Sequence, residues 1–252
     1  MTLLVTEFRV SRNLRDTVIA FASDRRITFR NGADPIFTRK VLPIPHLKSV
    51  VGYYGMAELR TKVYMWDWLP NVVKASYETA TLEEFAHYLR RAVQQYVGKE
   101  WLKSTPSGFH ICGFNSRGLP ELWHLSNHEM VDNQYVNCIS EYRISEDFLG
   151  RDAVDAGSDV VSGEVPRPFV AYYINGDVRP FHKAWLRLDG FAAEMLQQPD
   201  FSLKEDDRSN GRLIQWKMGA IGGFYSRFAK VPIIGGPTDV VFLREPAKKA
   251  AG

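Results

Sequence analysis

Four residues within the first forty positions are of types that can carry out hydrolysis: Thr2, Asp24, Arg26 and Lys40. Thr2 directly follows the initiator methionine, and methionine removal is efficient when the second residue is small. We therefore expect a mature chain that begins with a free threonine. A threonine hydroxyl is a weak nucleophile and needs a nearby base. The α-amino group of the same residue, with a reference pKa of about 7.7–8.0, can supply that base at neutral pH.

The charged residues could support such a nucleophile. A lysine ammonium beside the hydroxyl would lower its pKa, an aspartate would keep that lysine charged and oriented, and an arginine would balance the aspartate. The stretch "ASDRR" (22–26) ends an apolar run with one acid and two arginines, and Lys40 precedes the apolar "VLPI". A simpler interpretation stays open, in which Asp24 pairs with a nearby arginine at a sheet edge and Thr2 is an ordinary strand residue.

Other residues give weaker indications of chemistry. Cys112 lies in an apolar stretch and is expected to pack in the core. The glycine pairs in "IGGF" and "IIGGP" are too sparse for a phosphate-binding loop. No metal site and no cofactor are expected, because the histidines lack the paired spacing of metal ligands; they are His46, His87, His110, His124, His128 and His182.

Composition excludes several classes of protein. The net charge of +3 over 252 residues is small and the basic residues are scattered, so no nucleic-acid partner is expected. No apolar run reaches the length of a membrane span, and no targeting segment is visible. Two cysteines imply no disulfide framework. We expect a cytoplasmic chain with a single domain over residues 1–246 and a short flexible tail over residues 247–252.

Strands dominate the first 55 residues. Residues 3–10 and 17–23 are expected to form a hairpin around the polar turn "SRNLRD" (11–16), and the second of these strands is apolar enough to be buried on both faces. Shorter strands are expected at 37–45 and 47–55. A later hairpin is predicted at 109–115 and 122–127, a strand at 134–140 and a final strand at 235–245.

Helical patterns follow in two blocks. The first predicted helix covers residues 56–76, with Pro70 forcing a kink or break. The second covers 82–98, with Thr81 as N-cap and Glu84 completing a capping box. Later helices are predicted at 182–198 and 213–229, loops at 155–168 and 201–212, and a strand or the start of a helical region at 169–177.

This order of elements predicts an α+β fold. Blocks of strands separated by paired helices favour two antiparallel sheets between helix layers, a four-layer αββα sandwich, over a doubly wound parallel sheet. Residues 2–55 should form one antiparallel sheet layer on which the helices near 56–76 and 82–98 pack together. The helix face made by Phe85, Leu89 and Val93 should be buried.

The stretches "TVIAFASDRRITF", "TRKVLPIP" and "VVGYYGMAEL" resemble the opening of proteasome β-type subunits, in the N-terminal nucleophile hydrolase superfamily. Asp24, Arg26 and Lys40 fall at the mutual spacing of that family, and Gly52 and Gly55 match its glycine pair after a short deletion. The resemblance covers residues 2–125 and the ending "GGPTDVVFLRE".

Two features depart from the family pattern. The segment from Thr2 to Asp24 is longer, which a hairpin centred near residue 14 can absorb by pairing Thr2 with Arg26. The stretch "NCISEYRISEDFLGRDA" lacks the family's Gly-Ser-Gly segment, so the serine and aspartate that support the threonine in the family are not placed.

The resemblance implies a threonine peptidase in a ring-like homo-oligomer. Thr2 would be the nucleophile, supported by Asp24, Lys40 and Arg26, and the Gly52 backbone N–H would face the developing oxyanion. Peptides or unfolded proteins would be its substrates and an ATPase unfoldase a partner. Two alternatives remain: a subunit that no longer cleaves and serves in assembly or binding, and an amidohydrolase acting on a small amide. Retention of Met1 would favour the non-cleaving subunit.

Overall fold

The computed structural model describes residues 2–29, 33–131, 134–176, 178–204 and 206–245. Within these ranges the chain has a mixed α+β fold, and the strand pairs are antiparallel. The sequence-based prediction of antiparallel sheets is therefore confirmed. The predicted tail at 247–252 lies outside the described residues.

Two larger sheets carry most of the strands. The four-stranded sheet has the order β12-β1-β2-β13, and the five-stranded sheet has the order β11-β10-β9-β6-β5. The first contains β1 (Leu3–Val10), β2 (Val18–Asp24), β12 (Phe169–Gly176) and β13 (Thr238–Leu243). The second contains β5 (Val41–Ile44), β6 (Ser49–Tyr54), β9 (Gly108–Phe114), β10 (Pro120–Val131) and β11 (Gln134–Glu146).

Shorter elements connect these sheets. Two small hairpins pair β3 (Arg26–Ile27) with β4 (Ile36–Phe37) and β7 (Glu58–Arg60) with β8 (Val63–Tyr64). The helices are α1 (Met65–Ala75), α2 (Leu82–Tyr96), α3 (Lys99–Ser104), α4 (Ala153–Asp155), α5 (Val178–Leu196) and α6 (Asp207–Phe228). Single turns of other helix types occur at Leu14–Asp16, Pro45–Leu47 and Phe148–Asp152.

Strand β1 is buried on both of its faces along almost its whole length. Leu4 and Phe8 point into a cluster that includes Val50 and Cys112 of the five-stranded sheet, so the two sheets pack on each other. Leu3 and Val5 point the other way, into a cluster with residues of α5 and α6. Alternate residues therefore serve two cores, as expected for a doubly covered strand.

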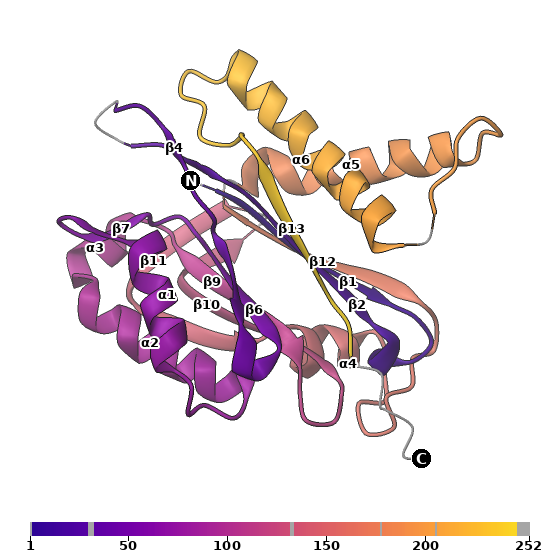
Figure 1. Ribbon diagram of the computed structural model, residues 1–252, viewed down its shortest axis with the longest axis horizontal. Helices are drawn as coiled ribbons and strands as arrows, with labels where there is room; N and C mark the ends of the chain where they lie inside the picture. The colour runs from indigo at the N-terminus through magenta and orange to yellow at the C-terminus, as the bar shows by residue number, and fades with distance from the viewer. Residues whose placement is uncertain (1, 30–32, 132–133, 177, 205, 246–252) are drawn as a thin grey trace.

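The helices lie on the outer faces of the two sheets (Figure 1). Figure 1 shows α5 and α6 on one side of the four-stranded sheet, and a cluster that contains Trp185 and Ile214 fills the space beneath them. On the far side of the molecule α1 and α2 cover the five-stranded sheet. Phe85, Leu89 and Val93 are fully buried there, as the sequence predicted.

The structure corrects the prediction that residues 2–55 form one sheet layer. Strands β1 and β2 belong to the four-stranded sheet, whereas β5 and β6 belong to the five-stranded sheet. The hairpin register also differs, because Leu4 lies opposite Ser23, one residue away from the register that would pair Thr2 with Arg26. The chain crosses between sheets after Asp24, which places the end of β2 beside the start of β5.

Two helix boundaries also differ from the predictions. The helix predicted from residue 56 begins at Met65, because Leu59 and Val63 lie in the β7–β8 hairpin, whose turn contains Lys62 at φ 62°. The helix then continues through Pro70 to Ala75 and does not break there. The loop predicted at 201–212 ends early, because the Asp206 side chain accepts the Ser209 amide at 2.7 Å and begins α6.

No helix in the described part of the chain is long and apolar enough to cross a membrane.

Candidate functional site at the start of strand β1

Thr2 lies directly before β1 and is almost fully buried, with 3% of its surface exposed. Its backbone is held against Gly176, the last residue of β12, which pairs with Leu3. Gly176 has a φ of +116°, and a Cβ on it would lie 1.4 Å from the Thr2 carbonyl oxygen. Only glycine permits this approach, because any side chain would overlap the Thr2 carbonyl. Residue 2 therefore has a fixed place between two strands.

The Asp24 carboxylate, at the end of β2, joins several segments. Its Oδ1 accepts the Leu3 amide at 2.8 Å and the Lys40 ammonium at 3.2 Å. Its Oδ2 accepts the Arg26 amide at 3.2 Å and the Gly235 amide at 3.3 Å. With 2% of its surface exposed, Asp24 depends on these donors to compensate for lost water.

Lys40 is fully buried. Besides Asp24, its Nζ donates to the Arg26 carbonyl oxygen at 2.6 Å. Burial lowers the pKa of Lys40 below its usual value, and the nearby Asp24 carboxylate only partly offsets this effect. A lysine in such surroundings gives up its proton more readily than one at the surface.

The structure thus brings Asp24 and Lys40 together next to residue 2. A buried ion pair adds little net stability, because desolvating both charges costs about as much as their attraction returns. Among the described residues no hydrogen bond joins the Thr2 hydroxyl to Lys40. Leu3 makes the connection, since its amide and the lysine share one carboxylate oxygen.

Arg26 does not balance Asp24 through its side chain as the sequence suggested. Its guanidinium Nε donates to the Pro232 carbonyl oxygen at 2.7 Å, and its central carbon lies 6.0 Å from the centre of the Phe37 ring. The main chain of Arg26 contributes instead, by donating to Asp24 and accepting from Lys40. The extended backbone between β2 and β3 presents these two groups in the same direction.

Gly52 also differs from its predicted role. It lies inside β6, opposite Val41 of β5 on one side and His110 of β9 on the other. A Cβ there would sit 2.6 Å from the Phe21 ring. Close packing between the two sheets therefore accounts for the glycine, whereas the sequence led us to expect a substrate strand beside it.

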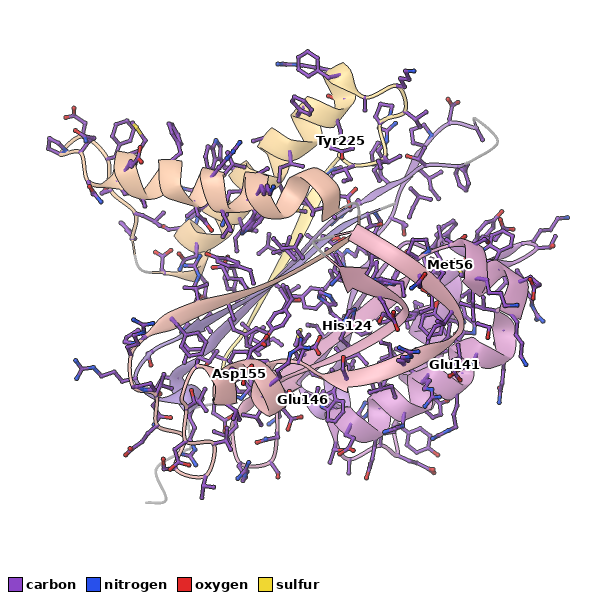
Figure 2. The ribbon with its side chains drawn as sticks, turned by 180° about the vertical axis from the view of Figure 1, so that it is seen from behind. Met56, His124, Glu141, Glu146, Asp155 and Tyr225 are labelled. Atoms are coloured by element: carbon purple, nitrogen blue, oxygen red, sulfur yellow. The ribbon has the colours of Figure 1, made fainter. Side chains whose placement is uncertain are left out.

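His110, His124 and His128 form a polar cluster around the ring of Tyr54. His110 is fully buried, with Nδ1 2.9 Å from the Thr6 hydroxyl and Nε2 2.8 Å from the Asn175 amide nitrogen. His124, near the centre of Figure 2, lies 2.9 Å from the Tyr54 hydroxyl and pairs with Asp147 at 3.3 Å. Burial lowers the pKa of His110 well below its usual value, so this imidazole is neutral.

The remaining candidates agree with a structural role. Cys112 is fully buried in the core between the sheets, and burial raises the pKa of its thiol. The described residues contain no cluster of three or more acidic, histidine or cysteine side chains able to hold a metal ion.

Gly235 is the site residue that sequence reasoning missed. The sequence predicts the final strand from residue 235 and argues against a phosphate loop at "IIGGP", but β13 begins at Thr238, and Gly235 and Gly236 before it have φ values of +141° and +78°. The sequence signal for this feature is the pair of adjacent glycines just before the final strand, because glycine adopts positive φ values that other residues rarely adopt.

The chain was compared with known proteins. No family model matches it, and no curated protein matches it. Among solved structures it is similar to the Anbu (Gly-1) mutant from Hyphomicrobium sp. strain MC1. The similarity covers 96% of this chain and 80% of that chain, with 12% identity and a TM-score of 0.46.

Proposed function

We propose that this protein is an N-terminal threonine hydrolase in which removal of Met1 frees the α-amino group of Thr2. One observation carries the proposal: a single Asp24 oxygen accepts both the buried Lys40 ammonium and the amide of Leu3, the residue after Thr2. This arrangement links a charge pair of little structural benefit to the residue that would be the nucleophile. The spacing of Asp24, Arg26 and Lys40, which resembles that of proteasome β-type subunits, supports the same conclusion.

The residues suggest a sequence of proton transfers. The Thr2 hydroxyl attacks the carbonyl carbon of an amide while its proton passes to the free α-amine, and the C–N bond then breaks as the leaving amine takes that proton. An ester on Thr2 remains. Water attacks the ester, the acid product leaves, and the Thr2 hydroxyl is restored. The positive charge of Lys40, held by Asp24, stabilises the alkoxide that develops on Thr2.

The fold supports the proposal at the level of architecture. The three apolar clusters lie between α1–α2 and the five-stranded sheet, between the two sheets, and between the four-stranded sheet and α5–α6. We assign this order as a four-layer αββα sandwich. Peptides or unfolded proteins are the proposed substrates, because the spacing of Asp24, Arg26 and Lys40 resembles that of proteasome β-type subunits.

One observation favours a different function, that of a subunit which binds or assembles without cleaving. In the described residues the Lys40 ammonium bonds to Asp24 and to the Arg26 carbonyl, and not to the Thr2 hydroxyl. Such a protein would keep the Asp24–Lys40 pair and show no hydrolysis.

We also propose self-association through the outer face of α5 and α6, here called the aromatic face. It is defined by Phe191 and Trp216, whose rings stack with centres 6.0 Å apart, and by Phe224 and Phe228, with centres 5.0 Å apart. These side chains are 52%, 40%, 61% and 71% exposed, respectively. At about 200 Å² for a fully exposed aromatic side chain, they leave roughly 450 Å² of apolar surface uncovered.

The size of the aromatic face favours a second copy of this chain as its occupant. A stable interface needs about 800 Å² from each partner, and the four rings already supply roughly half of it. Leu186 of α5 and Val231, three residues after the end of α6, are also exposed. A two-fold pairing would place the same aromatic face on both sides, so one surface covers itself.

The proposed activity is tested with a library of internally quenched peptides. The wild-type protein should cleave some of them, and Thr2→Ala should lose at least 1,000-fold in kcat/KM, a loss of about 4 kcal/mol in transition-state stabilisation. Thr2→Ser is the matched control, because it keeps a hydroxyl and a small second residue, and it should retain measurable activity. Lys40→Ala should act like Thr2→Ala, while Asp24 keeps three backbone donors.

Two results would decide against the hydrolase. Equal cleavage by wild type and Thr2→Ala would show that another residue or a contaminant acts. No cleavage of any peptide by a wild-type chain that has lost Met1 would support the non-cleaving subunit. Circular dichroism and urea unfolding of each variant check that the fold is intact.

A further inference from the structure

Residues 232–237, in the segment between α6 and β13, contact Asp24 and the backbone around the end of β2. Its Gly235 amide donates to Asp24 Oδ2 at 3.3 Å, across 211 residues of sequence. The other oxygen of that carboxylate serves Leu3 and Lys40. The donors on Oδ2 therefore fix how the carboxylate is turned toward its partners on Oδ1.

This segment is anchored at both of its ends to the strands that carry the site. The Pro232 carbonyl oxygen accepts from Arg26 Nε at 2.7 Å and from the Thr28 hydroxyl at 3.0 Å. The Pro237 carbonyl oxygen accepts the Arg25 amide at 3.0 Å. The Arg25 guanidinium also pairs with Asp239 in β13. These bonds hold the segment over the end of β2.

The backbone of the segment requires glycine at two positions. Gly235 and Gly236 have φ values of +141° and +78°, which other residues rarely adopt. A Cβ on Gly236 would lie 2.5 Å from the Phe37 ring. The amide of Gly235 therefore reaches Asp24 only because the chain can take this shape.

Helix α6 touches the segment with its backbone. A Cβ added at Gly222 would lie 3.1 Å from the Gly235 Cα, so the two main chains pack with no side chain between them. The neighbour is main chain held by the bonds above, and it cannot rotate away as a flexible side chain would. A methyl group at position 222 must therefore push either the segment or the helix.

We infer that residues 232–237 are the positioning element of the Thr2 site, in which the Gly235 amide orients Asp24 and Gly222 sets how closely α6 supports it. The effect of this element on catalysis rests on the proposed function, whereas its effect on Asp24 does not. The orientation of Asp24 is a property of the folded chain whether or not it hydrolyses amides. The position of α6 is thereby coupled to the Asp24–Lys40 pair.

The test compares Gly222→Ala with Gly223→Ala. Gly223 is the matched control, because it is the next residue of the same helix and a Cβ there meets nothing within 4 Å. Two readouts are used: the NMR resonances of the Asp24 carboxyl carbon and the Lys40 Nζ, and the kcat and KM of peptide cleavage. Gly222→Ala should shift both resonances and lower the Lys40 titration midpoint, since a turned carboxylate supports the ammonium less.

On peptide cleavage, Gly222→Ala should lower kcat about tenfold or more with KM within twofold, because it disturbs a charge in the site and not the substrate contacts. Gly223→Ala should match wild type in both readouts. Equal resonances in the two variants and wild type would overturn the inference. If Gly222→Ala does not fold, Arg26→Ala replaces it, because it removes the anchor at Pro232 while keeping the Arg26 main-chain bonds to Asp24 and Lys40.

The two readouts separate this inference from the proposed function. Shifted resonances without peptide cleavage by wild type would keep the positioning role and reject the hydrolase. Cleavage by all three proteins with unshifted resonances would keep the hydrolase and reject the positioning role.

Discussion

Lys40 and Lys217 are both fully buried, but their side chains have different partners. Lys217 of α6 donates to Asp189 at 2.6 Å and lies 4.1 Å from the centre of the Trp185 ring, which ties α6 to α5. Lys40 instead shares an aspartate oxygen with the main chain beside Thr2. Through that oxygen Lys40 is linked to the segment that begins at Thr2, whereas Lys217 is linked to a neighbouring helix.

The sequence predicted which residues lie at the site better than it predicted the hydrogen-bond partners of each residue. Asp24 and Lys40 lie together as the spacing shared with proteasome β-type subunits implied, whereas the apolar strand before Asp24 indicated only that this acid needs a partner and equally allowed an arginine. The side chain of Arg26 and the amide of Gly235 were not predictable. Their partners depend on how residues 232–237 return to β2, which is a long-range feature with no local pattern.

Histidine burial predicts a pH dependence of stability. Burial lowers the pKa of His128 to about 3, so between pH 6.5 and 3 the folded chain binds fewer protons than the unfolded chain. Stability is therefore lost as the pH falls, by about 1.4 kcal/mol for this histidine between pH 8 and pH 5.5. His110 acts in the same direction.

Urea unfolding at pH 8 and pH 5.5 measures this effect. His128→Gln should reduce the difference in unfolding free energy between the two pH values by about 1.4 kcal/mol. His87→Gln is the control, because His87 is exposed on α2 and its replacement should leave the difference unchanged. An unchanged difference in His128→Gln would show that the imidazole is protonated in the folded state.

At the scale of elements, local signals predicted α2 well and α1 poorly. Thr81 caps the helix as expected, with the Glu84 amide 3.1 Å from its hydroxyl, whereas the Glu84 carboxylate accepts the Ala80 amide at 2.7 Å instead of the Thr81 amide of a full capping box. The start of α1 was misplaced because Leu59 and Val63 happen to follow helical spacing while lying in a hairpin. Capping is a local interaction, whereas that hairpin depends on packing against α2.

The cap of α2 gives a prediction for this element. Thr81→Ala should lower the free energy of unfolding by about 1 kcal/mol, because the Glu84 amide loses its acceptor. Thr81→Ser keeps the hydroxyl and should stay within a few tenths of a kcal/mol of wild type. Urea unfolding at neutral pH measures both. Equal stabilities for the alanine and serine variants would mean that water replaces the cap without loss.

The whole molecule presents two unlike outer surfaces. Helix α2 turns its apolar residues inward, whereas α5 and α6 bury one set of residues and expose the aromatic face on their other side. A sequence pattern shows that such helices are apolar on more than one side, but not which side the sheet covers. The order of strands in the two sheets decides that, and it was not predictable from the sequence.

Light scattering tests self-association through the aromatic face. Wild type at micromolar concentration should show a mass of at least two chains of 28.8 kDa. The double variant Phe224→Glu/Phe228→Glu should be monomeric, because two charges would be buried without partners. Val161→Glu is the control, since Val161 is 76% exposed and lies outside the aromatic face. A monomeric wild-type protein would contradict the proposed interface.

The central claim, that Thr2 is a free N-terminal nucleophile, is tested most directly by the intact mass of the purified chain after exposure to a β-lactone. The strained ring opens on a reactive hydroxyl and adds its entire mass as an ester. The purified chain should lack Met1 and gain one lactone on Thr2, while Thr2→Ala should gain none. A chain that retains Met1, or one that lacks Met1 and remains unmodified at Thr2, would contradict it.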